Sequence, residues 1–593
     1  MRVAVCQFAS TDSVENNLST SIRMINEAAA GKADVIVLPE YCNAPCWYQD
    51  HNQAWQSALS LEGSFLQTIA EQAKQHHCYI SLGVTLRRDD MREHQNGDVK
   101  SNISVSSCLF APSGALIAHS DKQILIGCEQ DFFVCTSAKS TITDTELGNI
   151  GLLVGNDSLG FEQARAMTLA GAQILCHSTS TFAVDQSSLH SPARASENKV
   201  FIASANKVGM LIEPAHHDAF LAQYTLSESY LVAVGQSQIL SSTGAVLAQM
   251  SANEEGVIWA DINLADANTK KRPDGSDILK QRRPELYQTL LSSNNNSKNT
   301  HAARVAPNTV NTAIFATYTN HEQALEDVCF YIENNLSDII QLPELFFLAD
   351  KSVCENSEQR SALESFSKTV ERQISQVLRP FQYVCTSLVI DGKHQAVLIS
   401  EQGIIAMQQQ LHFCQRYQWT ELGNHLNIIE VPLEQGCITI AMLTADDANI
   451  AEIVKIAAIK GIHVLLVPFD VQEASEVQYQ LLARAAENRI CLLGATREKS
   501  LTNNATAASL IFEANRAQKQ GNHKQVKAHK STGFIANLSA DFTLFTQWQG
   551  RKPSGSINQP IVKPQFGKIT KALVQPNTST NKLLAVNYSV LTV

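Results

Sequence analysis

The chain repeats itself, and this repeat constrains its fold more than any other feature. The segment ARASENKVF at 193–201 recurs as ARAAENRIC at 483–491, an offset of 290 residues. VLPEYC at 37–42 recurs as QLPELF at 341–346, an offset of 304, so the first half carries a longer loop between these elements. A prior of ~150 residues per domain suggests about four domains for 593 residues, but self-similarity over this span predicts two related ones.

The boundary between the halves is visible in the composition. Residues 291–309, LSSNNNSKNTHAARVAPNT, are rich in Asn and Ser, and such a segment buries too little surface to order itself. We therefore predict domain 1 at 1–290, a linker at 291–309, domain 2 at 310–550 and a C-terminal tail at 551–593. The tail is basic: from Arg516 onward eleven Lys and Arg stand against one acid, although the whole chain has a net charge of −11.

Short apolar runs alternate with amphipathic stretches in each half. VAVCQF, ADVIVLP and YISLGV have the length of buried strands, whereas VENNLSTSIRMINEAAAG and FEQARAMTLAG carry apolar residues at helical spacing. Gly31 and Gly171 stand where helices end. Apolar strands interleaved with helices predict an α/β layered fold.

Composition excludes several classes of protein. No run approaches the ~18 consecutive apolar residues of a transmembrane helix, and the opening MRVAVCQFASTDSVENN lacks the apolar core of a secretory signal. Fourteen cysteines in so long a chain are not a disulfide scaffold, so we expect reduced thiols. These features predict a cytoplasmic globular protein with no membrane partner.

Three charged residues are candidates for a functional site. Glu40 follows an apolar strand and a proline, at the sheet edge where α/β proteins place their sites, although a lone carboxylate there can also be a solvated loop residue. Lys122, inside the apolar run AHSDKQILIG, must either reach water or pair with a carboxylate. Glu129 follows seven residues later.

These residues and the segments around them resemble the nitrilase, or carbon–nitrogen hydrolase, superfamily. In the first half the resemblance runs through VAVCQF, VLPEYCN, SNISVSSCLFAPSGALIAHSDKQIL, GNIGLLVGND, AGAQILCHSTS, ARASENKVFIASANKVG, VGQSQILSSTGAVLAQ and DILKQRRPELY. The second half shows LPEL, LARAAENRICLLGA and TAASLIFE and is more divergent. The resemblance implies a four-layer αββα sandwich in each half, two tandem sandwiches that form an internal pseudo-dimer, and self-association into larger oligomers.

The family uses a Glu–Lys–Cys triad, usually with a second glutamate. The resemblance makes Glu40 the general base, Lys122 the residue that stabilises the oxyanion, and Glu129 the second glutamate. The nucleophilic cysteine should follow the strand GNIGLLV, but that position holds Gly155, which cannot form a covalent intermediate. We expect the missing side chain to leave a small void beside Lys122.

The second half departs from the triad further. Setting GLLVGND against the stretch that contains AMLTADD at an offset of 289 pairs Asp157 with Asp446, the first of its two aspartates, and places Thr444 at the cysteine position. Glu344 matches the base, but Gln410 falls at the lysine position and cannot supply a charged oxyanion clamp. Thr444 could attack only with an activating base. Both halves are therefore predicted to lack the nucleophile that the family needs.

Other residues could supply chemistry. A substitute nucleophile could come from one of four cysteines, although such residues are commonly small buried hydrophobes: Cys42, Cys46, Cys128 and Cys176. His216, His217 and Asp218 look like a metal cluster, but adjacent side chains point apart and no further ligand has suitable spacing. We expect no metal and no cofactor.

The leading hypothesis is a pseudoenzyme whose first site binds a small amide, nitrile or carbamoyl-type ligand, as a sensor or partner subunit. One alternative is an active hydrolase of non-peptide carbon–nitrogen bonds with a nonstandard nucleophile. The other is an interaction protein that recruits an anionic partner through its basic tail. Because that tail has few arginines and no interleaved aromatic residues, nucleic acid is not the expected partner.

Overall fold

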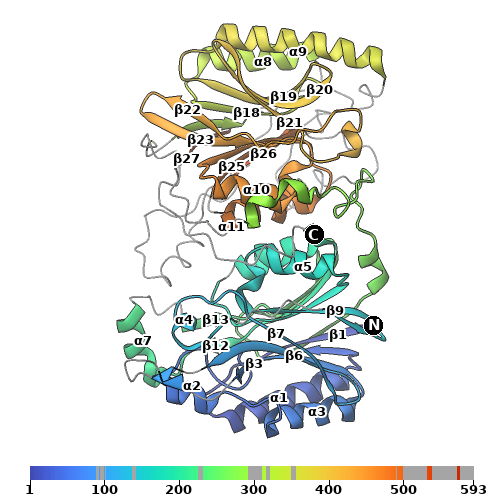
Figure 1. Cartoon of the computed structure of the whole chain (residues 1–593), viewed down its shortest axis with the longest axis vertical. Helices are drawn as coiled ribbons and strands as arrows, with labels where there is room; N and C mark the ends of the chain where they lie inside the picture. Colours follow the sequence, from blue (N-terminus) through green and yellow to red (C-terminus); the bar gives the residue numbers. More distant parts are fainter. Residues whose placement is uncertain are drawn as a thin grey trace, which may run out of the picture. The chain divides into compact units, whose positions relative to one another are not determined.

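The structure is a computed structural model of the chain (Figure 1). It describes residues 1–88, 92–93, 99–100, 102–135, 142–183, 185–224, 231–291, 307, 310–314, 321–348, 356–488, 490–497, 531–536 and 570–574. By their contacts these residues divide into two compact units, one over Met1–Lys270 and one beginning at Lys271. Apart from residues 291, 307 and 570–574, the predicted linker and basic tail lie outside the described residues.

Two six-stranded sheets form the centre of the first unit. In spatial order the first sheet contains β16 (Gly256–Asp261), β1 (Arg2–Gln7), β2 (Val35–Val37), β3 (Tyr79–Arg87), β6 (Ile103–Phe110) and β7 (Leu116–Asp121). The second contains β15 (Val246–Gln249), β14 (Gln238–Leu240), β11 (Phe201–Ala205), β10 (Ile174–Ser178), β9 (Gly148–Val154) and β8 (Ile142–Thr145). In each sheet the three strands β1–β2–β3 or β9–β10–β11 are parallel, and the outer strands pair antiparallel.

Helices cover the outer faces of both sheets, as the sequence predicts. Helices α1 (Val14–Ala30) and α3 (Ser64–His76) pack on the first sheet through Met24, Ile25 and Ile69. Helices α5 (Glu162–Leu169) and α6 (Ser191–Asn198) pack on the second sheet. Between the sheets lies an apolar layer that includes Val5, Val37, Leu152 and Ile174. The first unit is therefore an α–β–β–α sandwich.

Shorter elements complete the first unit. They are α2 (His51–Ser57), α4 (Glu129–Phe132), α7 (His217–Tyr224), the ribbon β12 (Val208–Met210) with β13 (Val232–Val234), and β4 (Arg92–Glu93) with β5 (Val99–Lys100). The predicted helix ends are confirmed, because α1 stops before Gly31 and α5 stops two residues before Gly171. Of these elements, α4 carries a candidate residue, Glu129.

The second unit has strand orders of the same form. One sheet runs β21 (Gly403–Gln409), β20 (Lys393–Ser400), β19 (Tyr383–Ile390), β18 (Ile339–Glu344), β17 (Val310–Ile314) and β27 (Thr570–Val574). The other runs β22 (Ile429–Leu433), β23 (Gly436–Met442), β24 (Val464–Pro468), β25 (Cys491–Arg497) and β26 (Ser531–Ala536). Again three strands in each sheet, β17–β18–β19 and β23–β24–β25, are parallel.

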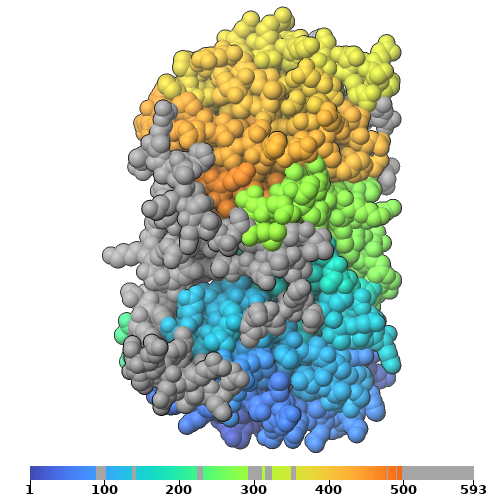
Figure 2. Space-filling model, viewed as in Figure 1, coloured from blue at the N-terminus to red at the C-terminus, as the bar shows by residue number. Residues whose placement is uncertain are grey.

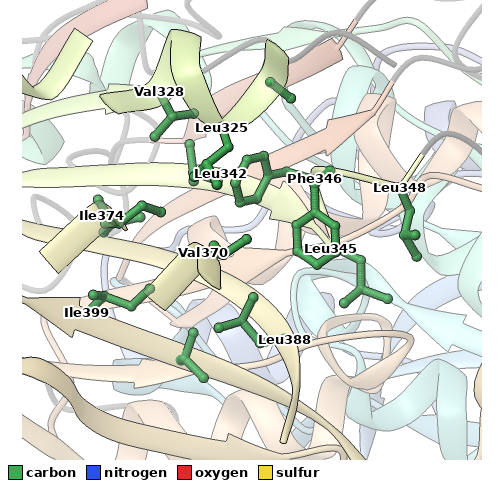
Figure 3. Packing of buried hydrophobic residues seen from close by; sticks show 14 of the residues in the cluster. Leu325, Val328, Leu342, Leu345, Phe346, Leu348, Val370, Ile374, Leu388 and Ile399 are labelled. Atoms are coloured by element: carbon green, nitrogen blue, oxygen red, sulfur yellow. The ribbon is translucent and has the colours of Figure 1, made fainter. Parts of the chain in front are cut away.

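Two long helices cover the first of these sheets. Helices α8 (His321–Asn334) and α9 (Ser357–Val377) place Leu325, Val328, Val370 and Ile374 against Leu342 and Leu388 of the sheet (Figure 3). The opposite face of α9 forms part of the yellow surface in Figure 2. On the other sheet lie α10 (Ala451–Ile459) and α11 (Leu481–Asn488). No helix among the described residues is both long enough and apolar enough to cross a membrane.

The segment Lys271–Leu291, which the sequence places in domain 1 as far as residue 290, belongs to the second unit by its contacts. Arg282 forms an ion pair with Glu452 of α10, 2.9 Å between Nε and Oε1, and both side chains are buried. Tyr287 lies 2.9 Å from His412 through its hydroxyl. The end of the first repeat is thus part of the packing of the second unit. The predicted pseudo-dimer of two sandwiches stays a prediction.

Candidate active site

Glu40 lies three residues beyond β2, at the carboxyl edge of the parallel strands. The backbone N–H of Leu38 donates to the carbonyl of Ser81 at 2.8 Å, and that of Glu40 donates to Thr179 at 3.2 Å. Gly83 in β3 makes room for this loop, because a Cβ there would lie 2.6 Å from the Cα of Glu40. The loop therefore runs against the sheet, and the Glu40 side chain is 1% exposed.

Lys122 joins the two predicted carboxylates. Its ammonium donates to Glu40 Oε1 at 2.9 Å and also to Glu129 Oε1, and Lys122 itself is 1% exposed. The predicted contact between Glu40 and Lys122 is confirmed, and Lys122 pairs with carboxylates rather than reaching water. Burial alone would lower the pKa of Lys122, but the charges of Glu129 and Glu40 raise it above its usual value. Lys122 is therefore a fixed cation.

Glu40 has a different electrostatic setting from that of Lys122. Burial raises the pKa of the Glu40 carboxyl to about 7, against the opposing attraction of Lys122, while the nearby charge of Glu129 also raises it. A carboxyl with a pKa near neutrality can both accept and release a proton at physiological pH. Glu40 therefore has the protonation behaviour that a general base requires.

Two neighbouring residues were not found from the sequence. The hydroxyl of Tyr41 donates to Glu129 Oε1 at 2.7 Å, and the ammonium groups of Lys122 and Lys207 lie 5.7 and 5.5 Å from its ring centre. Lys207 is 2% exposed and donates to the carbonyl of Ala44 at 3.4 Å. Burial lowers the pKa of Lys207 to about 8. Like Glu40, it stands just beyond the end of a buried strand, and that signal could have identified it.

Asp157 positions the loop that carries Lys122. Its carboxylate accepts hydrogen bonds from the backbone N–H groups of Gln123 at 3.0 Å and Ile124 at 2.8 Å. Burial raises the pKa of this carboxyl to about 7. The residue next to Lys122 is thereby held to the turn that follows β9, so the lysine and the predicted nucleophile position lie together.

Gly155 lies at this turn with φ +47°, in the left-handed region. Its carbonyl faces Nε2 of His177 at 2.9 Å, and Ser204 lies at 2.9 Å from Nδ1 of the same ring. Because burial lowers the pKa of His177 to about 4, the ring is neutral, so Nε2 donates to Gly155 and Nδ1 accepts from Ser204. The second sheet, through His177 of β10 and Ser204 of β11, therefore holds the backbone at Gly155 in place.

The predicted void beside Gly155 is not present. A Cβ on Gly155 would lie 2.7 Å from both Glu40 Oε2 and Lys122 Nζ, and closer still to Glu40 Oε1. The carboxylate and the ammonium thus occupy the space that a side chain would need, which corrects the expectation from the sequence. The same contact shows that a side chain at this position would point directly at the base and the lysine.

The four candidate substitute cysteines differ in their surroundings. Cys176 lies in the layer between the sheets and Cys42 donates to the carbonyl of Pro39 at 3.0 Å; burial raises the pKa of each thiol to about 12. Burial also raises the pKa of Cys128. A hydrogen bond from Cys128 lowers the pKa of Cys46, more than burial raises it. Of the four, Cys46 has the environment that most favours a thiolate.

The corresponding place in the second unit centres on Glu344, which is fully buried. Its carboxylate accepts from the hydroxyl of Tyr417, from the backbone N–H of Ala445 at 2.9 Å and from Thr444 Oγ1 at 3.5 Å. The side-chain amide of Gln410 donates to the carbonyl of His412 at 2.8 Å. The glutamate is therefore held by a phenol and a backbone amide.

Backbone contacts correct the pairing of the two halves by one residue. Asp447 accepts from the N–H groups of Leu411 and His412, both at 2.8 Å, as Asp157 does from Gln123 and Ile124. Asp157 therefore corresponds to Asp447, at an offset of 290, and not to Asp446.

This correction changes the residue at the nucleophile position of the second unit. Counting two residues back from each aspartate gives Gly155 and Ala445, with φ of +47° and +53°. Thr444, predicted for this position, is one residue too early. Gln410 keeps its match to Lys122, and Tyr417 corresponds to Glu129. At these matched positions the first unit carries a glycine and the second an alanine.

One group in the second unit has the spacing of metal ligands. Single atoms of Asp274, Cys414 and Asp446 lie within 4.8 Å of one another. Arg416 already pairs with Asp274 at 2.8 Å and with Asp446 at 3.0 Å, and Arg272 pairs with Asp446 at 3.3 Å. Because two guanidinium groups balance these carboxylates, we assign the group as an ion-pair network.

Comparison with known proteins gives matches to one family. The carbon-nitrogen hydrolase family model matches residues 2–272. A nitrilase of Pyrococcus abyssi is 27% identical over 274 residues, covering 46% of this chain and 93% of its own. An omega-amidase of Mus musculus is 26% identical, covering 48% and 96%. A solved amidase from Nesterenkonia sp. shares 21% identity with a TM-score of 0.37, covering 49% and 95%.

Proposed function

Because residues 2–272 are a carbon–nitrogen hydrolase domain of the nitrilase superfamily, we propose that this chain is a pseudoenzyme of that family. It binds a small amide, nitrile or carbamoyl-type ligand at Glu40 and Lys122, as a sensor or partner subunit, without covalent turnover. One observation carries the proposal. The backbone position that faces both Glu40 and Lys122 is Gly155, which has no atom that can attack a carbonyl.

The retained residues support noncovalent recognition. An ammonium group such as that of Lys122 donates to a carbonyl oxygen or a nitrile nitrogen, and a carboxylate such as Glu40 accepts from an amide N–H. Both side chains are 1% exposed and contact one another at 2.9 Å. Binding therefore requires this contact to open, and the ligand then replaces a hydrogen bond that each side chain already makes.

The experiment uses the full chain with propionamide, propionitrile and N-carbamoylglycine as probes. We expect saturation-transfer NMR to detect binding of at least one probe, with no acyl adduct by intact mass and no release of ammonia above the buffer. Lys122→Met should abolish the transfer, whereas Lys74→Met, at an exposed lysine of α3, should not change it. Circular dichroism of each variant checks that it has folded. Should no probe bind, the ligand-binding role is wrong.

The alternative, an active hydrolase with a nonstandard nucleophile, gives a different result in the same samples. An adduct on any cysteine, with release of ammonia, would replace the pseudoenzyme proposal. Cys46 is the first residue to inspect, since the hydrogen bond from Cys128 lowers its pKa. Peptide mapping of the adduct then identifies the nucleophile directly.

A further inference from the structure

Two thiols lie together beside the site, and neither the family match nor the proposed function uses them. Cys46 stands in the loop that follows Glu40, and Cys128 directly precedes Glu129 at the start of α4. The thiol of Cys128 donates to the carbonyl oxygen of Cys46, with 3.9 Å between Sγ and the oxygen. Two residues 82 positions apart in the chain thus lie in direct contact.

The surroundings of the pair differ between the two sulfurs. Cys128 is fully buried, whereas Cys46 is 9% exposed, so a small reagent reaches Cys46 first. The hydrogen bond from Cys128 and the charge of Lys207 lower the pKa of Cys46, whereas burial, Glu129 and Glu40 raise it, and the net change is a lower pKa. The thiolate is the reactive form of cysteine. Cys46 is therefore placed to react first and Cys128 to react second.

We propose that Cys46 and Cys128 are a peroxide-sensitive thiol pair that closes to an intramolecular disulfide beside the Glu40–Lys122 site. In the first step the Cys46 thiolate attacks hydrogen peroxide, the O–O bond breaks, and a sulfenic acid and hydroxide form. In the second step the Cys128 sulfur attacks the Cys46 sulfur and displaces the hydroxyl group, which leaves as water. Overall, two thiols and one peroxide give one disulfide and two waters.

The disulfide would connect the loop that carries Tyr41 to the first turn of α4. Tyr41 and Lys122 both donate to Glu129, the residue after Cys128. The crosslink would therefore fix the position of one carboxylate that holds Lys122. It would also close a long stretch of chain, which restricts the unfolded state and raises the stability of the folded unit.

The test is a non-reducing peptide map of the full chain after exposure to hydrogen peroxide and alkylation of the remaining thiols. Trypsin should release residues 33–74 and 123–139 as a linked pair, lighter by two hydrogen atoms than the sum of the free peptides. Each peptide also contains a second cysteine, Cys42 or Cys135. Fragmentation of the linked pair identifies the joined sulfurs without any substitution.

Four variants provide matched controls. Cys46→Ala and Cys128→Ala should lose the linked pair, whereas Cys42→Ala and Cys135→Ala should keep it. The melting temperature of the oxidised chain should rise relative to the dithiothreitol-treated chain, and this rise should vanish in Cys128→Ala. Peroxide is increased until Cys135, which is exposed, becomes oxidised. If the link is still absent then, or if it joins other cysteines, the proposal is overturned.

Discussion

At the scale of single residues, two backbone positions with positive φ decide what the sites can do. Gly155 and Ala445 stand at φ +47° and +53°, each two residues before an aspartate that binds a neighbouring loop. An L-residue in this region costs about 1–2 kcal/mol, and glycine avoids that cost. Ala445 shows that this backbone accepts a Cβ in the second unit. A side chain at Gly155 is therefore a strained substitution that the fold can accommodate.

The first prediction concerns Gly155→Cys, with Gly155→Ala as its matched control. Both variants should unfold about 1–2 kcal/mol more easily than the native chain, because φ is unfavourable and the ends of Glu40 and Lys122 must move. Urea unfolding measures this cost. Only the cysteine variant should form an acyl adduct with propionamide, detected by intact mass. An adduct on the alanine variant would show that the nucleophile lies elsewhere.

The second prediction concerns Glu40 and pH. Its pKa is raised to about 7 in the folded chain, so the folded state binds a proton that the unfolded chain has released above pH ~4.5. The resulting stability is present below pH ~4.5 and is lost as pH rises through about 7. Compared with Glu40→Gln, the native chain should lose up to about 3 kcal/mol of unfolding free energy between pH 4.5 and 8.

Urea unfolding of both chains at several pH values measures this difference. Glu71→Gln, at an exposed glutamate of α3, is the control and should follow the native chain. Parallel stability curves for the native chain and Glu40→Gln across this range would contradict the raised pKa.

Much of the first site could be predicted from the sequence, because apolar strands ending in charged residues identify one edge of a parallel sheet. Glu40 was found in this way, Lys122 as a charge inside an apolar run, and Glu129 through the family resemblance; Lys122 does contact both glutamates. The closed space at Gly155 could not be predicted, since it depends on which rotamers the neighbouring side chains adopt. In the second unit, two adjacent aspartates at 446 and 447 are both candidates in the sequence, and the backbone hydrogen bonds identify Asp447 as the counterpart of Asp157, at the same offset of 290 as ARASENKVF and ARAAENRIC.

At the scale of elements, the periodicity of apolar residues predicted the strands and helices well, but it did not predict which of the two units each segment joins. The segment Lys271–Leu291 follows β16 of the first unit in sequence, yet its side chains pair within the second unit. Short segments without regular structure carry no periodicity that reveals their partners. Their placement depends on ion pairs such as that of Arg282 with Glu452, which no local pattern contains.

The third prediction tests this ion pair. Arg282→Met removes the 2.9 Å contact with Glu452, whose side chain is fully buried, and should destabilise the second unit by about 3–5 kcal/mol. Adding Glu452→Leu should recover most of the loss, because the pair is then replaced by apolar groups. Urea unfolding of the two single variants and the double variant gives the coupling energy. If the loss of unfolding free energy in the double variant equals the sum of the two single losses, the two side chains do not stabilise one another.

At the scale of the whole molecule, the repeat predicted two bodies, and each unit has its own apolar layers. Leu82 belongs to the helix-covered core of the first unit and Leu388 to that of the second, and both are fully buried. Self-association, the internal pseudo-dimer and the role of the basic tail at 551–593 stay predictions.

The fourth prediction is that a cavity in one core destabilises the unit that contains it and leaves the other unit unchanged. Leu82→Ala and Leu388→Ala should each cost about 2–5 kcal/mol, since each leaves a cavity in a close-packed layer. Hydrogen exchange followed by mass spectrometry should show faster exchange in β3 but not in β19 for the first variant, and the reverse for the second. Equal acceleration in both strands would mean that the two units open as one.

The position of Lys271–Leu291 also determines where the chain can be divided into two parts. A recombination event in the Asn- and Ser-rich stretch that separates the repeats would yield two unequal fragments. The upstream one would end in a segment of short turns whose partners, such as Glu452, it does not encode, and the downstream one would lack Arg282 and Tyr287. Each fragment would therefore separate groups that the intact chain holds together, such as Arg282 and Glu452, even though each half has a strand order of its own.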